Sequence, residues 1–283
     1  MTNIGAMIVR DLPPAAIVSH AQAIESYYDE LWVVEDLPFA GGISQAATVL
    51  AATEQVVVGH GIAPAAFRNP ASLAMEWATL AELYPGRFAA GIGHGVQTWM
   101  AQLGERVDSP LTLLSETIAA VRSLLAGETV SVAGRYVKLD DVTLVFPPAT
   151  PPLVSAGVSG PKSLRLSGAV ADGTIIGEGH GPTEVARARA LIDEGRSEAG
   201  RTDHHRVTVF TGFYVGEPDG LGAANPDAAS GWEAIGATTD EVTARLQNLV
   251  DTGVDSIVLV PMGKDKTEQL VLAGEVIVPG LSR

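Results

Sequence analysis

The sequence contains no cysteine among its 283 residues. Disulfides, thiolate-held metals, iron–sulfur clusters and cysteine nucleophiles are therefore excluded. Long apolar runs are missing as well, since no stretch reaches the roughly 18 residues that a membrane-spanning helix needs. The first residues, MTNIGAMIVRDLPP, lack a basic segment followed by an apolar core. We therefore expect no signal peptide, no membrane span and a cytoplasmic location.

Positive charge is also scarce. The chain has 18 Lys and Arg residues against 33 Asp and Glu residues, which gives a formal net charge of −15. Only four of the basic residues are lysines, namely Lys138, Lys162, Lys264 and Lys266. Binding to nucleic acid needs a clustered basic surface, and anionic membranes attract one, so the composition argues against both partners. We expect a small-molecule substrate instead.

What the sequence does contain is an alternation of short apolar runs with longer helical patterns. Several of the runs are apolar on both faces, which is typical of buried parallel strands. Eight strands alternating with helices predict a single α/β domain over residues 1–283, a (β/α)8 TIM barrel, with a doubly wound sheet as the alternative. The strands are predicted to begin near Asn3, Glu30, Gln55, Arg87, Pro152, Asp172, Arg206 and Asp255.

Local signals mark helix starts and two insertions. Asn69-Pro70 and Ser109-Pro110 each place a capping side chain before a first-turn proline, which predicts a helix start. Residues 129–147 alternate apolar and polar residues, which predicts a hairpin after the fourth helix. Residues 216–238 are rich in Gly, Ala and Pro, and we expect a mobile loop there, after the seventh strand.

Glycines gather at the predicted carboxyl ends of the strands, where barrels place their sites. Gly61 ends the third strand, Gly93 and Gly95 end the fourth, and Gly157 ends the fifth. A residue without Cβ lets a flat ligand approach the main chain, so these glycines would line one wall of a pocket. The alternative is that they form ordinary strand-to-helix turns.

The segment that follows the fifth strand has the features of an anion site. Gly160 and Pro161 suit the start of a helix, and its free amides, with the Ser159 hydroxyl, would bind a group such as phosphate. Lys162 places one of the four lysines at the same point. The alternative is a capped helix with a solvated lysine.

Three histidines, His60, His94 and His180, lie at predicted strand ends close to carboxylates. Imidazole and carboxylate groups suit zinc or manganese. However, no two of these histidines have the spacing that holds a metal at fixed geometry, so we predict no metal site. His204 and His205 fall on the opposite face of the barrel, where we expect both to be solvated.

In their order and spacing, these segments resemble the bacterial luciferase-like monooxygenase superfamily. The resemblance is strongest to the branch of F420-dependent oxidoreductases that includes methylenetetrahydromethanopterin reductase, and it covers nearly the whole chain. It is carried by residues 31–36 (LWVVED), 58–62 (VGHGI), 68–70 (RNP), 80–88 (LAELYPGRF), 91–95 (GIGHG), 160–164 (GPKSL) and 171–173 (ADG).

The resemblance implies a deep pocket at the carboxyl ends of the strands that holds F420, or FMN as the alternative, with its phosphate against the loop after the fifth strand. It also implies a non-proline cis peptide on the third strand, and the matching bond is Gly61–Ile62. A homodimer is the family expectation. On this basis we assign cofactor binding to Glu35, Gly61, Ile62, Gly93, Gly95, Gly157, Ser159, Gly160, Pro161 and Lys162.

The chain departs from its branch at two positions. F420-dependent relatives often carry Asp-His at the end of the second strand, where this chain has Glu35-Asp36. In the sugar-phosphate dehydrogenase branch a catalytic Glu follows the glycines of the fourth strand, and the matching residue is Val96, so glucose 6-phosphate is a poor substrate prediction. Asp36 and His94 are the nearest replacements for proton transfer; alternatively, either is a hydrogen-bonding wall residue.

We predict an F420-dependent oxidoreductase that transfers hydride between the deazaflavin and an unidentified small organic substrate. Two alternatives stay open: an FMN-dependent luciferase-like monooxygenase, and a protein that binds flavin or deazaflavin without turnover. The substrate pocket is expected to be shaped by the 216–238 loop and by Phe39, Trp99, Met100, Glu178 and His180.

Overall fold

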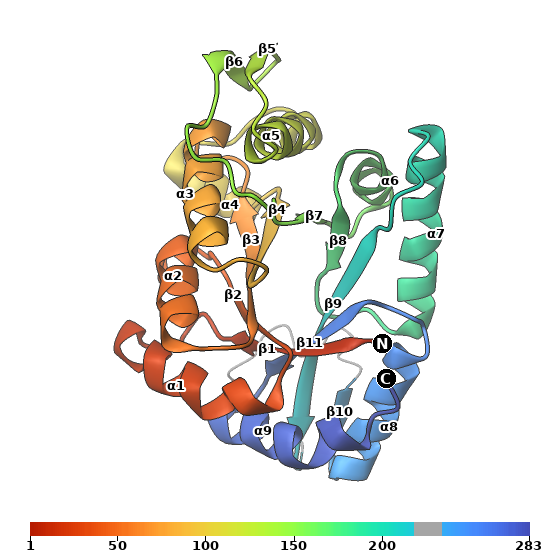
Figure 1. The fold of residues 1–283 in the computed structure, drawn as a ribbon. Coiled ribbons are helices and arrows are strands. Elements are labelled where there is room, and N and C mark those ends of the chain that lie inside the picture. The colour runs from red at the N-terminus through yellow and green to blue at the C-terminus, as the bar shows by residue number, and fades with distance from the viewer. Residues whose placement is uncertain (218–233) are drawn as a thin grey trace.

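The computed structural model describes residues 1–217 and 234–283, and its centre is a closed barrel of parallel strands (Figure 1). The strands follow one another around the barrel in the order β1-β2-β3-β4-β7-β8-β9-β11, and β11 pairs again with β1. All eight predicted strands are present, so the barrel is confirmed over the doubly wound sheet. Their bounds are β1 Asn3–Ile8, β2 Glu30–Val33, β3 Val57–Pro64, β4 Phe88–Gly93, β7 Val154–Gly157, β8 Gly173–Ile176, β9 Arg206–Val215 and β11 Ser256–Pro261.

Helices surround the barrel and begin where the capping signals predict. The Asn69 side chain accepts a hydrogen bond from the Ala71 amide at 2.9 Å, at the start of α3. Ser109 caps α5 through the Thr112 amide. The helices are α1 Ile17–Ile24, α2 Gly42–Ala52, α3 Pro70–Leu83, α4 Gln97–Leu103, α5 Pro110–Leu125, α6 Pro161–Val170, α7 Pro182–Glu198, α8 Thr239–Val250 and α9 Lys266–Leu272. Short helical turns cover Pro14–Ala16, Glu25–Tyr27, Ala273–Ile277 and Val278–Gly280.

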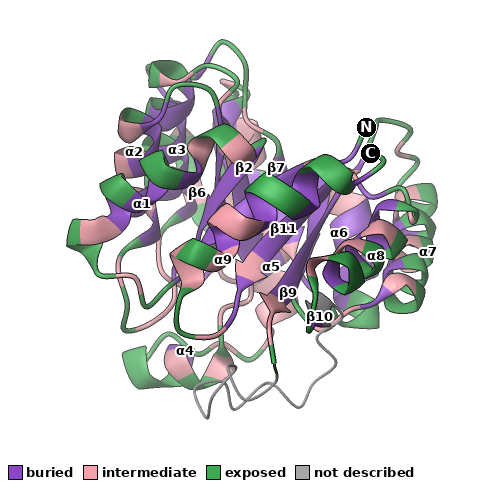
Figure 2. Ribbon diagram, turned by 90° about the horizontal axis from the view of Figure 1, so that it is seen from below, coloured by how far each residue is buried: buried purple, intermediate pink, exposed green. Residues whose placement is uncertain are grey.

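The apolar residues form two layers, because successive side chains of a strand point to opposite faces. The larger cluster lies between the strands and the helices, where the buried strands meet the inner faces of the helices (Figure 2). A smaller cluster uses the other set of strand positions and fills the inside of the barrel. It consists of Met7, Val9, Trp32, Ile175, Phe210 and Val258. This inner layer lies beneath the cavity described below.

The two predicted insertions differ in outcome. The hairpin is confirmed: β5 Val130–Ala133 and β6 Lys138–Val142 pair antiparallel and project beside α5, away from the barrel (Figure 1). Of the predicted 216–238 loop, residues 218–233 lie outside the described residues. A short strand that the sequence did not predict, β10 Ala234–Gly236, runs parallel to β9.

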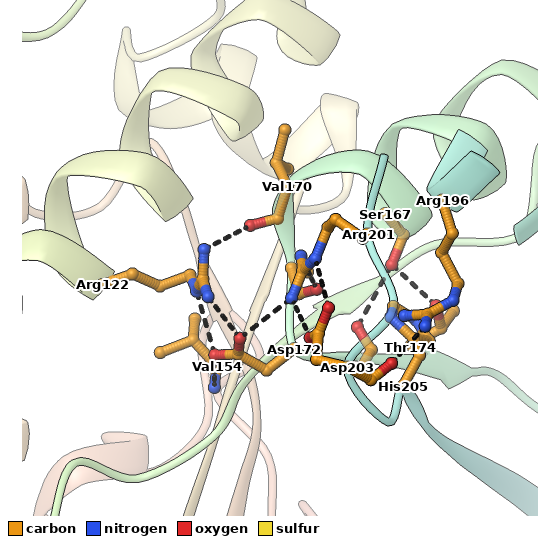
Figure 3. A network of polar contacts seen from close by, with 12 residues as sticks. Arg122, Val154, Ser167, Val170, Asp172, Thr174, Arg196, Arg201, Asp203 and His205 are labelled. Carbon is orange, nitrogen blue, oxygen red and sulfur yellow. Dashed lines mark hydrogen bonds and ion pairs between the residues drawn. The ribbon is translucent and has the colours of Figure 1, made fainter. Parts of the chain in front are cut away.

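A buried polar network joins β8 to α6 and to the start of β9 (Figure 3). The prediction that His205 is solvated is wrong: its side chain is buried, and its Nε2 lies 2.8 Å from the Thr174 hydroxyl. That hydroxyl in turn lies 2.7 Å from the Ser167 hydroxyl of α6. Burial is the largest cause that lowers the pKa of His205 to about 4. His204 is exposed as predicted, and lies 2.7 Å from the Asp255 carboxylate.

A second set of ion pairs lies in the same view (Figure 3). The Arg122 guanidinium donates to both carboxylate oxygens of Asp172, and Asp172 accepts a further bond from the Val154 amide at 3.0 Å. Arg201 pairs with Asp172 and Asp203. These contacts tie α5, β7 and β8 together. None of the helices in the described part of the chain is long and apolar enough to cross a membrane.

Candidate active site

A cavity of about 910 Å³ opens at the carboxyl ends of the barrel strands. Parallel strands bring these ends to one rim, which is where barrels place ligand sites. Of the residues assigned from the sequence, five line this cavity: Asp36, Gly61, Ile62, Gly157 and Ser159. Glu178 and His180, predicted to shape the substrate pocket, line it too, whereas Phe39, Trp99 and Met100 do not.

The floor of the cavity is built around Ile62. The Gly61–Ile62 peptide is cis, as predicted. A Cβ on Gly93 would lie 2.2 Å from Ile62 Cδ1, and one on Gly157 would lie 2.4 Å from the same atom. Gly93 does not line the cavity. The predicted glycine wall is thus present at Gly61 and Gly157, which line the cavity, but not at Gly93. At Gly93 and Gly157 the missing side chains also make room for Ile62.

Trp32 supports the floor from inside the barrel. A Cβ on Gly61 would lie 2.7 Å from Trp32 Cε3 and 2.9 Å from Phe210 Cζ, so only glycine fits above these rings. The two rings meet edge to face, with their centroids 5.4 Å apart. Trp32 Nε1 donates to Glu30 at 2.8 Å, and this buried carboxylate also accepts from Ser256. The indole is thus fixed at its polar end while its apolar face carries the floor.

Asp36 lies in the loop after β2 and lines the cavity. Its carboxylate accepts a hydrogen bond from Arg10 Nη1 at 3.2 Å, and its side chain is 28% exposed. The Arg10 guanidinium also lies over the Phe39 ring, 5.3 Å from its centroid. Phe39, predicted to shape the substrate pocket, does not line the cavity but contacts Arg10, which does.

Glu35, assigned to cofactor binding from the sequence, is buried and does not line the cavity. Its two carboxylate oxygens accept hydrogen bonds from the two terminal nitrogens of Arg68, each at 2.6 Å. The Gly42 amide, at the start of α2, donates a third bond at 3.2 Å. Burial by itself raises the pKa of Glu35, but the bonds and charge of Arg68 outweigh it and lower the pKa. Glu35 ties the β2 end to α2 and to the β3–α3 loop.

His60 extends this buried network towards β3. Trp77 Nε1 donates to His60 Nδ1 at 3.3 Å, so the proton of a neutral ring lies on Nε2, which faces Glu35 at 3.6 Å. Burial is the main cause that lowers the pKa of His60 to about 4. Sequence reasoning gave neither Arg68 nor Trp77 a role in the site; Arg68 entered only as part of the 68–70 segment that carries the resemblance.

The turn from β7 to α6 contributes Gly157, Val158 and Ser159 to the cavity. Gly160 precedes the helix and Pro161 is its first residue, as predicted. Lys162 is exposed and does not line the cavity. Gly157, Val158 and Ser159, rather than Lys162, therefore line this side of the cavity.

His94 and Gly95 follow β4 and also lie outside the cavity lining. The His94 ring hydrogen bonds to the backbone of Pro110 at the start of α5, and burial lowers its pKa. Gly95 has a positive φ of 69° and packs against the Met100 sulfur. The role of His94 in proton transfer stays a prediction, and its placement does not support it.

Sequence reasoning gave no anion-binding role to the cations that do line the cavity. These are Arg10 at the end of β1, and Lys264 and Lys266 after β11. A usable signal was present, because both lysines immediately follow a predicted strand, at the rim where ligands bind. No group of three or more His, Asp or Glu side chains among residues 1–217 and 234–283 is arranged to hold a metal ion.

Comparison with known proteins places this site in context. The family model described as luciferase-like monooxygenase matches residues 1–229. The 5,10-methylenetetrahydromethanopterin reductase of Methanolobus tindarius is 26% identical over an alignment of 316 residues, covering 94% of this chain and 96% of that protein. An F420-dependent glucose-6-phosphate dehydrogenase of Microbacterium testaceum is 28% identical over 285 residues, covering 87% and 83%. A solved F420-dependent secondary alcohol dehydrogenase, in complex with an F420–acetone adduct, shares 20% identity over 100% of each chain with a TM-score of 0.88.

Proposed function

Because the chain belongs to the luciferase-like monooxygenase family, we propose that it is an F420-dependent oxidoreductase acting on a small organic substrate. The observation that carries the proposal is the cavity at the rim of the barrel with Ile62 as its floor. Two relatives support this choice: a 5,10-methylenetetrahydromethanopterin reductase at 26% identity and an F420-dependent glucose-6-phosphate dehydrogenase at 28% identity.

The residues of the cavity fit a deazaflavin. Its volume of about 910 Å³ lies within the range of cofactor pockets. Ile62, Ile175 and Phe210 offer an apolar surface to a flat ring. On one side, the main chain of Gly157–Ser159 leads into the first turn of α6, where free amide groups attract a phosphate. This fit supports the assignment of Gly157 and Ser159 to the cofactor, whereas Gly160 and Pro161, which lie outside the cavity lining, are proposed only from their place at the start of α6.

F420 would supply the hydride chemistry, and the protein would supply binding, orientation and control of the proton. We assign proton transfer to the carboxylate of Asp36, because this side chain lines the cavity and accepts a hydrogen bond from Arg10. Asp36→Asn keeps the shape and removes the basic oxygen. We expect hydride transfer to slow by about 100-fold while F420 binding is retained. The assay follows F420 absorbance with a panel of alcohols, aldehydes and imines, and a variant with unchanged rate would remove Asp36 from this role.

Equilibrium binding of F420 and of FMN, each followed by ligand fluorescence, tests the proposal most directly. We expect saturable binding of F420 at one site per chain and weaker binding of FMN. Tight binding of FMN with none of F420 would overturn the choice of cofactor.

The second candidate is an FMN-dependent monooxygenase, which the description of the matching family favours. The same cavity and the same Ile62 floor would hold the flavin ring. The two functions differ in whether oxygen is consumed, so an oxygen electrode with reduced FMN and the same panel of compounds separates them.

A third candidate is a protein that binds the cofactor without turnover. Full titration by F420 with no hydride transfer to any compound of the panel would favour it.

A further inference from the structure

One side of the cavity, called the arm below, is lined by residues of two neighbouring segments. The arm lies between the segment from β1 to α1, which contributes Asp11 and His20, and the segment from β11 to α9, which contributes Lys264, Lys266 and Thr267. β1 and β11 are neighbouring strands, whereas β7 and β11 are separated by β8 and β9. In a closed barrel of eight strands, the arm and the proposed phosphate position therefore lie on nearly opposite sides of the mouth.

The charges of this arm are paired except for one. Arg10 is bound to Asp36, and Lys266 Nζ contacts both carboxylate oxygens of Asp11, at 2.5 and 2.7 Å. Lys264 is exposed and has no ion-pair partner among the described residues. In a chain with a net charge of −15, an unpaired cation at the rim of the cavity is a specific local attraction for an anion.

The base of the arm holds an unused hydrogen-bonding group. His20 is 4% exposed, and its Nδ1 lies 2.9 Å from the Thr267 hydroxyl. Its Nε2 is buried and has no hydrogen-bond partner in the protein. Burial lowers the pKa of His20, which keeps the ring neutral near pH 7. If Thr267 donates to Nδ1, the ring proton lies on Nε2, where no described residue places an acceptor. Seven buried side-chain polar atoms among the described residues lack a partner, and His20 Nε2 is the one whose residue lines the cavity, so a ligand atom is one way to supply its partner.

We propose that this arm is a subsite for an oxyanion carried by the substrate, a carboxylate or a phosphate, with Lys264 supplying charge and His20 Nε2 a hydrogen bond. This inference depends on the proposed function in one respect: it takes the molecule that binds in the arm to be the substrate of the enzyme. It narrows the substrate class to small organic molecules that bear an acidic group distant from the reacting carbon. Neutral alcohols or aldehydes would leave both groups unused.

The test uses histidine side-chain NMR on protein labelled with 15N-histidine, because the chain has only six histidines. The probes are inorganic phosphate and acetate, each titrated at constant ionic strength with chloride as the balance, with and without F420. We expect the His20 signals, assigned by their loss in His20→Gln, to shift with saturation for at least one probe. The phosphate and acetate arms show which oxyanion the subsite prefers.

Variants identify the contribution of each group. Lys264→Ala should lower the affinity for the probe anion by about fivefold, as expected for an exposed charge contact. Thr267→Val leaves the side-chain volume nearly unchanged but removes the hydroxyl that orients His20. This variant should lower the affinity for the probe anion by about tenfold. Lys138→Ala, which removes an equal charge from the hairpin strand β6, should leave the affinity unchanged.

The outcomes separate this inference from the proposed function. If F420 binds but neither probe moves the His20 signals, or if Lys138→Ala weakens the probe as much as Lys264→Ala does, the subsite is overturned and the cofactor assignment stands. If the probe binds through Lys264 while F420 does not bind, the subsite stands and the cofactor assignment fails.

Discussion

Two sets of glycines in this barrel lack room for a side chain for different reasons. At the mouth of the barrel, where Ile62 forms the floor of the cavity, a Cβ on Gly93 or Gly157 would collide with the Ile62 side chain, at 2.2 and 2.4 Å respectively. Where α6 and α7 pack together, a Cβ on Gly195 would lie 1.9 Å from the carbonyl oxygen of Arg165. A Cβ on Gly168 would lie 2.1 Å from a carbonyl oxygen of the opposite helix.

The difference separates a constraint set by one side chain from a constraint set by the backbone of a neighbouring helix. A side chain can rotate or be shortened by mutation, so the spacing at the mouth is set by the choice of Ile62. A carbonyl oxygen can only move with its helix, so Gly168 and Gly195 fix how closely α6 and α7 approach. Because α6 begins beside the cavity, the second set of glycines positions the first turn of α6 from a distance.

The largest effect is expected from Gly195→Ala. The new methyl group would have to push α6 and α7 apart, and we expect a loss of about 3 kcal/mol in the free energy of unfolding. Urea denaturation followed by circular dichroism measures it. Gly41→Ala is the matched control, because a Cβ there meets nothing within 4 Å at an ordinary φ of −66°, and it should change stability by less than about 0.5 kcal/mol. Equal effects in the two variants would erase the distinction between the sets.

The buried histidine near α6 predicts a smaller, pH-dependent effect. Burial first, and then Arg196 and Arg201, lower the pKa of His205 to about 4, while Asp203 and Asp172 oppose them. The unfolded chain therefore binds a proton at His205 at higher pH than the folded chain does, so stability falls as the pH drops from about 6.5 towards 4. The full shift corresponds to about 3 kcal/mol, of which only a part is lost at pH 5. His205→Gln should flatten this dependence in urea titrations between pH 7 and 5, and an unchanged slope would contradict it.

The sequence was sufficient for elements that are local in origin. The eight strands, the Asn69 and Ser109 caps and the 129–147 hairpin all follow from short-range pattern and turn chemistry. The partners of the glycines could not be read in this way, because Ile62 meets Gly157 only after strands 95 residues apart in the chain come together. For the same reason Glu35 was assigned to the cofactor, since nothing near it in sequence indicates that Arg68 binds it. The cis Gly61–Ile62 bond was anticipated from family resemblance, and no local propensity predicts it.

The mouth can be tested with a pair of substitutions. Gly93→Ala should lower the free energy of unfolding by about 1 to 2 kcal/mol and weaken F420 binding, because the new methyl group displaces Ile62 towards the cavity. Ile62→Val removes the Cδ1 atom that lies 2.2 Å from the new Cβ, and the next contacts are at 3.1 Å or longer.

The double variant should therefore be more stable than the sum of the single changes predicts, with a coupling energy of about 1 kcal/mol. Urea denaturation of the four proteins and F420 titration of each complete the cycle. Additive effects would show that Gly93 is constrained by something other than Ile62. The mouth would then be as rigid as the packing of α6 against α7.

The smallest effect is expected from Lys162→Ala. The sequence placed this lysine in the anion site, but the structure leaves it exposed outside the cavity, while Gly157, Val158 and Ser159 line the cavity. The nearby Arg165 does not replace it, because its guanidinium is paired with Glu194 at 2.6 Å. An exposed charge contributes little, so we expect F420 affinity to fall by less than about twofold. A tenfold loss in fluorescence titration would instead show that Lys162 turns towards the ligand. The first turn of α6 would then bind through a mobile side chain, and its positioning by Gly168 and Gly195 would matter less for function than the comparison implies.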